Sequence, residues 1–324
     1  MTARDLRDLI SAYGERDDLK FRRAAQAIIA NEERKRHTVL ATELRHLLAA
    51  GGSEVSVREI PRMPEPPTDR DSALPLARVS HPDVQLDDLT LAPAVRETFT
   101  GLVQEVRRWP ELDRMNVPRR NRVLLAGPPG CGKTSAAAAL AGALGRPLVT
   151  ARVEGLISSF IGETATNLAN LFEYVSNGSY VFFLDEFDSI GKLRDDPTDH
   201  GELRRVVNAL LQMIDGYRGG SLIVAATNHA EVLDAALWRR FDVISELGLP
   251  TVGQIETMLR HELPLGFSAF DVAGIAARLS GLPHAAVQFL LDSAKRRAIL
   301  AHRKKVNIDD VSLALTETVG RRWS

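Results

Sequence analysis

The spacing of apolar residues predicts helices over residues 1 to about 50. Apolar side chains recur at helical intervals, with charged residues between them, in runs around Leu6–Ile10, Phe21–Ile29 and Leu40–Leu48. Gly51-Gly52 then supplies a stop signal. The pattern predicts two or three amphipathic helices that pack on one another, on the rest of the chain or on a partner.

Residues 51–83 differ in composition because prolines interrupt them repeatedly. Proline fixes φ and lacks a backbone N–H, so neither a helix nor a central strand fits here. The prolines are Pro61, Pro64, Pro66, Pro67, Pro75 and Pro82. We expect a linker, partly extended, that acts as a spacer; a proline-rich docking motif is the less favoured alternative.

Between residues 84 and 250, short apolar runs alternate with helical patterns, which is typical of a parallel α/β sheet. The five predicted strands are Val123–Ala126, Leu148–Ala151, Tyr180–Leu184, Leu222–Ala226 and Val243–Leu247. The sequence therefore predicts an α/β domain at 84–250, with a five-stranded parallel sheet and flanking helices.

After Pro250 the pattern becomes purely helical. Thr251 and Gln254 form a capping box, helices continue through Ala301, and a last helix is expected near Asp310–Leu315. We expect a small all-helical lid at 251–324, preceded by the α/β domain, the linker 51–83 and the helical region 1–50. The final residues 322–324, which include Trp323, are expected to be a frayed tail rather than a docking element.

The composition is that of an ordinary soluble protein, with 44% hydrophobic and 26% charged residues. The net charge of −1 creates no global field that would attract nucleic acid or an anionic membrane. Cys131 is the only cysteine, so an intrachain disulfide is impossible and a reducing compartment is expected. The sequence has no signal-peptide pattern and no apolar run of the ~20 residues that span a bilayer, so we expect a cytoplasmic protein.

A glycine-rich segment lies between the first predicted strand and an alanine-rich helix. It reads Gly127-Pro128-Pro129-Gly130-Cys131-Gly132-Lys133-Thr134 and fits G-x-x-x-x-G-K-T. Its glycines allow backbone N–H groups to converge on phosphate oxygens, and the helix N-terminus adds positive partial charge. We expect Lys133 to reach the β- and γ-phosphates of ATP, Thr134 to ligate Mg²⁺, and Cys131 to be a spacer. A glycine turn without a ligand is the alternative.

Two acids follow the apolar strand that ends at Leu184. At the carboxyl end of a parallel strand, Asp185 and Glu186 would emerge at the crevice where ligands bind. We expect Asp185 to hold Mg²⁺ through its water shell and Glu186 to orient and deprotonate the attacking water. Acids that merely cap a turn are the alternative, and Asp188 is expected to be a helix cap or an indirect support of the metal.

A third polar position follows the strand Leu222–Ala226. Thr227-Asn228 ends a strand that we place between the strand before the glycine-rich loop and the strand before the acids. There the amide of Asn228 would hydrogen-bond the γ-phosphate or the attacking water. A plain turn asparagine is the alternative.

These residues resemble the AAA ATPases, a family of ring-forming remodelling motors. The likeness covers roughly Asp87 to Leu315 and rests on segments that follow the family's order: GPPGCGKT, FFLDEFDSIG, RRVVNALLQMIDG, AATN and LDAALWRRFD. The resemblance implies an enzyme that binds ATP and Mg²⁺, hydrolyses ATP, assembles with copies of itself as a ring (usually a hexamer), and acts on protein substrates.

Matching by position assigns further roles. Asn228 matches the family's sensor asparagine, and His261 matches a histidine that lies against the ribose. Ser280-Gly281 matches the segment near the adenine. Phe160-Ile161-Gly162, followed by Glu163, resembles the loop that lines the ring's pore and grips extended polypeptide; a core position for Phe160 is the alternative.

Arg239 and Arg240 fall where the family places arginine fingers, which reach the γ-phosphate held by the neighbouring subunit. A guanidinium there is worth ~10³–10⁵ in rate in related NTPases. Many members separate the two arginines by a short glycine-containing insertion, which this chain lacks. Because adjacent side chains diverge, we expect one of them, with Arg239 slightly favoured, to reach the phosphate. The other would pair with an acid across the interface.

Within the family, the chain is most similar to small bacterial ATPases encoded beside a subtilisin-like serine protease, some of which are associated with plasmid incompatibility or antiviral defence. The chain has no HExxH zinc motif and no evident serine triad, so proteolysis would be a partner's work, and residues 1–80 would recruit the target or that protease. Two alternatives stay open. One is a nucleic-acid-dependent ATPase, weakly favoured by the basic run 34–37 and disfavoured by the net charge; the other is a nucleotide-gated scaffold with slow hydrolysis.

Overall fold

The computed structural model describes residues 25, 28, 29, 64–69, 72–152, 161–188, 201–230, 235–262 and 271–323, without the side chains of 161–163, 201–206 and 235–236. The chain divides into two compact units, residues 1–65 and 66–324. In the first unit Ala25, Ile28 and Ile29 are helical and both isoleucines are buried, which agrees with the predicted helical spacing.

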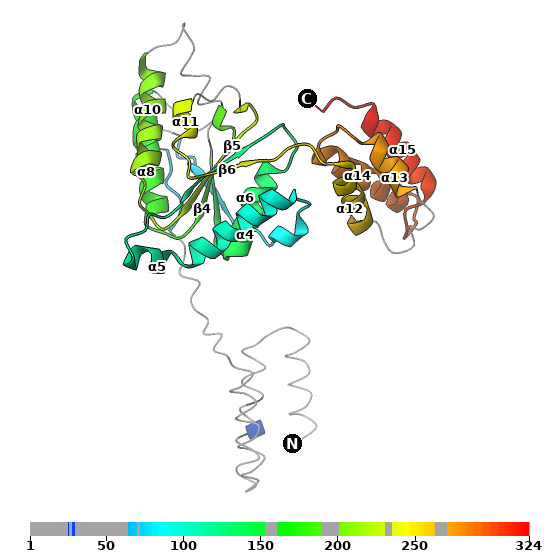
Figure 1. Ribbon diagram of the computed structural model, residues 1–324, viewed down its shortest axis with the longest axis horizontal. Helices are drawn as coiled ribbons and strands as arrows, with labels where there is room; N and C mark the ends of the chain where they lie inside the picture. Colours follow the sequence, from blue (N-terminus) through cyan, green and yellow to red (C-terminus); the bar gives the residue numbers. More distant parts are fainter. Residues whose placement is uncertain are drawn as a thin grey trace. The chain divides into compact units, whose positions relative to one another are not determined.

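The second unit contains a six-stranded sheet (Figure 1). Its strands are β1 (Ala77–Ser80), β2 (Arg122–Ala126), β3 (Leu148–Ala151), β4 (Val181–Leu184), β5 (Leu222–Thr227) and β6 (Val243–Glu246). Their order is β1-β3-β4-β5-β2-β6, and all pairs are parallel except β1 with β3. All five predicted strands are present, and β5 lies between β2 and β4 as expected.

Strand β1 corrects the prediction in two respects. It lies inside the segment 51–83 that we predicted to be a linker, and it makes the sheet six-stranded and mixed rather than five-stranded and parallel. Among the described strands β1 lies at the edge and pairs with β3 alone, with Ala77 opposite Ala151. Pro75 and Pro82 lie just outside the strand, where a missing N–H breaks no ladder hydrogen bond.

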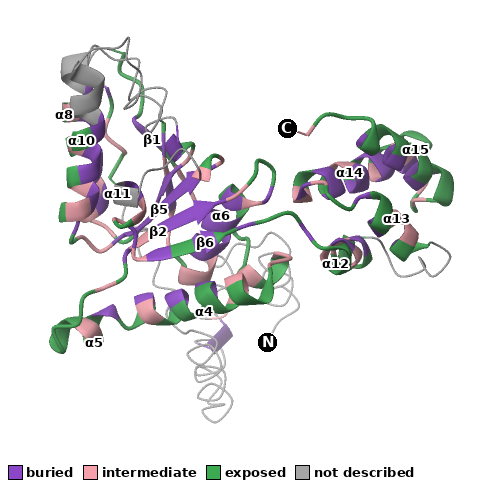
Figure 2. Ribbon diagram, turned by 45° about the horizontal axis from the view of Figure 1, so that its top comes forward, coloured by how far each residue is buried: buried purple, intermediate pink, exposed green. Residues whose placement is uncertain are grey.

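Helices cover both faces of the sheet. The helices among the described residues of this part are η1 (Leu86–Asp88), α4 (Pro93–Arg107), α5 (Trp109–Arg114), α6 (Lys133–Leu144), α8 (Ile161–Ser176), α10 (Gly201–Gly216) and α11 (Ala235–Trp238). The alternation of side chains along a strand explains the layers, because Phe183 packs in one core with α4 and α6 whereas Phe182 contacts Phe172 of α8 on the other face. The central strands β4 and β5 are therefore buried at every residue (Figure 2).

A helical bundle follows β6 and has its own apolar core. It consists of α12 (Val252–Glu262), α13 (Val272–Arg278), α14 (His284–Leu300) and α15 (Ile308–Val319). The predicted capping box at the start of α12 is present: the Gln254 N–H donates to the Thr251 hydroxyl at 3.3 Å, and the Thr251 N–H donates to the Gln254 side chain at 2.9 Å. No helix within the described ranges is both long and apolar enough to cross a membrane.

The prediction of a frayed tail is wrong for the residues up to Trp323. The Trp323 indole N–H donates to the carbonyl of Thr318 at 2.9 Å, and its ring packs edge-to-face on Phe289 of α14 at 5.6 Å. The Arg321 guanidinium lies over both rings. These contacts attach the tail to the bundle.

Candidate functional site

The loop between β2 and α6 has a backbone that only glycine accommodates at two positions. Gly127 has φ +146°, and a Cβ there would lie 2.1 Å from the carbonyl oxygen of Leu247, directly after β6. Gly132 has φ +89° and is the N-cap residue of α6. The loop therefore passes against the end of β6 and enters α6 through a left-handed residue, as expected for a phosphate-binding loop.

Lys133 is the first residue of α6, and its side chain reaches back to the loop. It is 6% exposed, and its ammonium donates to the carbonyl oxygens of Gly127 at 2.7 Å and Pro128 at 2.9 Å. Burial lowers the pKa of Lys133, while Cys131 and the carboxylate of Asp185 act in the opposite direction. The loop thus holds a partly desolvated positive charge where the sequence predicts phosphate oxygens.

The first acid of the predicted pair lies beside the loop. The Thr134 hydroxyl donates to one carboxylate oxygen of Asp185 at 3.2 Å, and the other carboxylate oxygen accepts the N–H of Glu186 at 2.9 Å. A hydroxyl and a carboxylate side by side are ligand types that Mg²⁺ takes from proteins, together with phosphate oxygens and water. Chain segments far apart in the sequence therefore meet as predicted.

Glu186 adopts an uncommon backbone conformation. Its φ is +51°, in the left-handed region, and its side chain is exposed at the end of β4. Such a conformation costs on the order of 1–3 kcal/mol for a residue other than glycine and is concentrated at functional sites. Glu186 also lines the cleft described below.

Asp188 links the segment after β4 to the end of β5. It is 4% exposed, and one carboxylate oxygen accepts the Thr227 hydroxyl at 3.3 Å and the Asn228 N–H at 3.2 Å. Asn228 is thereby held at the end of β5, and it lines the same cleft as Glu186. In the described structure Asp188 therefore supports Asn228.

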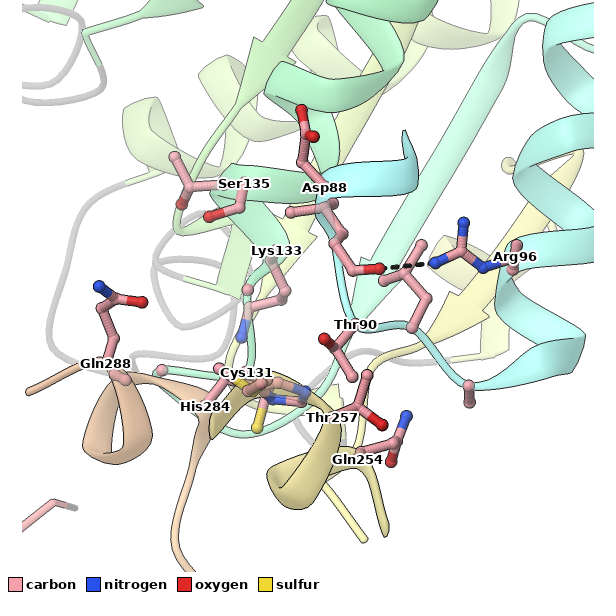
Figure 3. Close-up of a pocket in the computed structure, with 18 of the residues that line it drawn as sticks. Asp88, Thr90, Arg96, Cys131, Lys133, Ser135, Gln254, Thr257, His284 and Gln288 are labelled. Atoms are coloured by element: carbon pink, nitrogen blue, oxygen red, sulfur yellow. Dashed lines mark hydrogen bonds between the residues drawn. The ribbon is translucent and has the colours of Figure 1, made fainter. Parts of the chain in front are cut away.

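These side chains open into a cleft of about 1010 Å³ between the sheet edge and the helical bundle. This volume is at the upper end of the range for small-molecule sites. The walls come from residues 87–93, 129–135, 185–186 and 228, and from α12 and the first turns of α14. Figure 3 shows Thr90, from the segment before α4, together with Lys133 of α6, Thr257 of α12 and His284 of α14 around the cleft.

Sequence reasoning missed the wall formed by residues 87–93. Arg96 of α4 fixes this wall, because its guanidinium donates to the carbonyls of Leu89 at 2.6 Å and Leu86 at 3.2 Å, and pairs with Asp87 at 3.0 Å (Figure 3). The segment has no periodic or motif signal, since its contribution is a backbone path held by a distant arginine.

The second missed element is the start of α14. His284, Ala285 and Gln288 line the cleft, and the Ala285 N–H donates to the carbonyl of Gly130 at 3.0 Å. Burial lowers the pKa of His284, although a hydrogen bond with the Thr90 backbone raises it, and Nδ1 has no partner among the described residues.

Of the residues whose roles came from the family resemblance alone, some line the cleft and others do not. His261 lines the cleft with an exposed side chain, whereas Gly281 lies in the turn before α14 and does not line it. Ile161 and Gly162 begin α8, and Phe160 lies outside the described residues.

Arg239 and Arg240 do not line the cleft. They lie in the turn between α11 and β6, and Asp242, just after them, donates its N–H to the carbonyl of Arg122 at the start of β2. The glycine-rich loop leaves the other end of β2, roughly 16 Å away at ~3.3 Å per residue. The two arginines therefore lie near the starting ends of the parallel strands, whereas the cleft lies at their carboxyl ends.

The sequence comparisons identify the family of the chain. A family model described as ATPase family associated with various cellular activities (AAA) matches residues 123–249. An uncharacterized AAA family ATPase of Sinorhizobium fredii, y4kL, is 37% identical over 317 residues, which cover 98% of this chain and 95% of that protein. The chain belongs to the AAA family of ATPases, and the enzyme it forms hydrolyses ATP.

Two more distant relatives carry descriptive names. The ATP-dependent zinc metalloprotease FtsH 3 of Sphaerobacter thermophilus is 33% identical over 252 residues, 75% of this chain and 50% of that protein. A proteasome-activating nucleotidase of Thermococcus kodakarensis is 31% identical over 264 residues, 78% of this chain and 66% of that protein. The chain thus matches only half of the former and 66% of the latter.

Proposed function

We propose that this chain is the motor subunit of a ring that hydrolyses Mg·ATP at sites shared between neighbouring subunits, and that the ring remodels or threads protein substrates. The observation that carries the proposal is the separation of the parts. The parallel strands end beside Lys133, Thr134, Asp185 and Glu186. The two arginines of the finger motif lie instead where these strands begin.

Each residue of the cleft has a chemical task in this proposal. Lys133 exchanges its carbonyl partners for β- and γ-phosphate oxygens, and Thr134 and Asp185 hold Mg²⁺. Bound Mg²⁺ neutralises charge on the phosphates. Glu186 accepts a proton from the attacking water, and Asn228 donates a hydrogen bond to that water or to the γ-phosphate.

The position of the two finger arginines supports a ring. A guanidinium stabilises the transition state of phosphoryl transfer, yet Arg239 and Arg240 do not line the cleft of their own chain. A second copy, placed with the starting ends of its strands against the cleft, would supply the arginine. A hexamer is the arrangement that the family resemblance implies.

Protein is the substrate class we favour. The support is the likeness of Phe160-Ile161-Gly162 to a pore loop, together with relatives whose names refer to a protease and to the proteasome. We further propose a cytoplasmic motor whose separately encoded partner is a serine protease, in a plasmid-incompatibility or antiviral defence system. A nucleic-acid-dependent ATPase and a slow scaffold are the competing functions.

Dilution and mixing test the shared site. The ATPase rate per subunit should fall when the protein is diluted below its assembly concentration. Arg239→Ala protomers and Glu186→Gln protomers, inactive separately, should regain part of the activity when mixed, because one supplies an intact cleft and the other an intact arginine. A rate per subunit independent of concentration, with no recovery in any mixture, would refute shared sites.

Substrate class is tested by comparing casein with duplex DNA as activators. We expect unfolded casein to stimulate ATP hydrolysis and Phe160→Ala to abolish that stimulation while basal turnover survives. Stimulation by DNA in a salt-sensitive manner, with none by casein, would instead favour the nucleic-acid function. Turnover unaffected by either, with slow single-turnover hydrolysis, would favour the scaffold.

A further inference from the structure

The two adjacent arginines have different surroundings. Arg239 is exposed and forms no hydrogen bond or ion pair with any other described residue. Arg240 is 28% exposed; it pairs with the carboxylate of Asp215 and donates to the carbonyl of Leu211 at 3.4 Å. Its Nε is buried and has no partner among the described residues. One guanidinium thus faces solvent, and the other lies on the C-terminal half of α10.

The turn itself separates the two side chains. After α11, the Arg240 N–H donates to the Leu237 carbonyl at 3.1 Å and the Phe241 N–H donates to the Trp238 carbonyl at 3.3 Å. These consecutive bonds fix a tight turn, so successive side chains leave it in different directions. The residue that points outward is Arg239.

Two further contacts hold the turn from its C-terminal side. Phe241 is buried and packs edge-to-face on Phe187, with the ring centroids 5.6 Å apart. Phe187 directly follows Glu186 in the sequence. The Asp242 carboxylate accepts two hydrogen bonds from the Arg122 guanidinium, at 2.7 and 3.0 Å, and also the N–H of Asn121. The turn is therefore attached to α10, to β2 and to the segment after β4.

We propose that Arg239 is the arginine that reaches the neighbouring subunit's phosphate, and that Arg240 is a positioning residue that holds the Arg239 turn on α10 through Asp215. This inference rests on the shared site proposed above. The ion pair that the sequence placed across the subunit interface is instead made within the chain, to Asp215. An arginine that is already paired and partly buried would have to break these contacts before it could bind a phosphate.

The test compares kcat for ATP at saturating nucleotide and at subunit concentrations well above assembly. Arg239→Ala should lower kcat ~10³-fold or more, as loss of a finger does. Arg240→Ala and Asp215→Ala should each lower it ~10- to 100-fold through misplacement of the catalytic arginine, with little change in the affinity for a fluorescent ATP analogue. Arg240→Lys, which retains the charge opposite Asp215, should recover much of the loss.

Double variants separate positioning from contact. If Arg240 acts only through Arg239, then Arg239→Ala/Arg240→Ala should be no slower than Arg239→Ala, and Arg240→Ala/Asp215→Ala no slower than either single variant. The matched control is the exposed pair Arg108–Glu111 at the start of α5, whose alanine variants should retain the wild-type kcat. Thermal denaturation of every variant identifies losses that arise from unfolding, and Arg240→Lys and Asp215→Asn replace any variant that does not fold.

Three outcomes would overturn the inference. In the first, Arg240→Ala lowers kcat as much as Arg239→Ala does while Asp215→Ala has no effect. In the second, the double arginine variant is slower than Arg239→Ala, and in the third, neither Arg240→Ala nor Asp215→Ala changes kcat. Each of these can occur while mixed protomers still recover activity, so the shared site would stand. Failure of recovery in the mixing experiment would refute the shared site itself.

Discussion

The hydroxyl of Thr134, in the first turn of α6, donates a hydrogen bond of 3.2 Å to the carboxylate of Asp185, at the end of β4. The two residues are 51 positions apart in the chain, and they meet because β2 and β4 are parallel strands that end at the same edge of the sheet. This contact defines where a magnesium ion would be held, and it leads to the first prediction.

Removing either of the two proposed oxygen ligands should weaken the response to Mg²⁺. We expect Asp185→Asn and Thr134→Val to lower activity at fixed Mg²⁺ by about 10–100-fold, the range typical of changes at metal sites. Thr134→Ser retains the hydroxyl and is the matched control. ATP hydrolysis titrated with MgCl₂ measures the effect, and an unchanged titration curve for Thr134→Val would exclude Thr134 as a ligand.

Glu186→Gln should separate binding from hydrolysis. The amide cannot accept the proton of the attacking water, so we expect kcat to fall by about 10²–10⁴. The affinity for ATP should be retained, because Lys133, Thr134 and Asp185 are intact. Single-turnover hydrolysis and equilibrium binding of a fluorescent ATP analogue measure the two quantities, and a parallel loss of both would point to a structural role for Glu186.

Gly127→Ala should destabilise the α/β domain. The added methyl group would lie 2.1 Å from the Leu247 carbonyl oxygen, and φ +146° is a conformation that L-residues avoid. We expect a loss of about 1–3 kcal/mol in the free energy of unfolding, together with impaired ATP binding. Gly101→Ala is the control: it lies in α4 with no atom within 4 Å of its added Cβ, so it should be neutral or stabilising by roughly 0.5–1 kcal/mol. Urea denaturation of both variants distinguishes these effects, and equal stabilities would contradict the packing argument.

Asp188→Ala should affect both stability and turnover. It leaves the Thr227 hydroxyl and the Asn228 N–H without their acceptor in a buried region, which costs about 1–3 kcal/mol. Since Asn228 is then no longer fixed, kcat should also fall. Asp188→Asn retains one acceptor oxygen and should be milder in both respects; denaturation and steady-state kinetics compare the two, and an Asp188→Asn variant as damaged as Asp188→Ala would indicate that the negative charge matters more than the acceptor.

His284 predicts a pH dependence of stability. Burial lowers the pKa of His284 in the folded protein below its ordinary value of 6.5, so the unfolded chain binds the proton more tightly. The stability that depends on the neutral imidazole is complete above pH 6.5 and is lost as the pH falls from 6.5 through the folded-state pKa. Thermal denaturation between pH 5 and 8 should show a smaller loss for His284→Gln than for the wild type. Identical slopes would show that His284 titrates alike in both states.

Much of the candidate site follows from the sequence because its chemistry depends on local patterns. A glycine-rich loop between a buried strand and a helix fixes Lys133 and Thr134, and acids at the end of an apolar strand emerge at the same edge of a parallel sheet. The five parallel strands were likewise readable, because strands buried on both faces are continuous apolar runs. β1 was not predicted, because an edge strand among prolines lacks a continuous apolar run.

The tertiary structure decided what depends on contacts between distant segments. No local pattern shows that Arg96 holds the wall at residues 87–93, that His284 faces the same cleft, or that Asp215 takes Arg240. Hydrogen bonds and ion pairs of this kind depend on how elements pack, and packing brings together residues whose separation in the chain carries no information. The sequence thus determined the catalytic chemistry of this protein, whereas the fold decided which of two adjacent arginines faces outward.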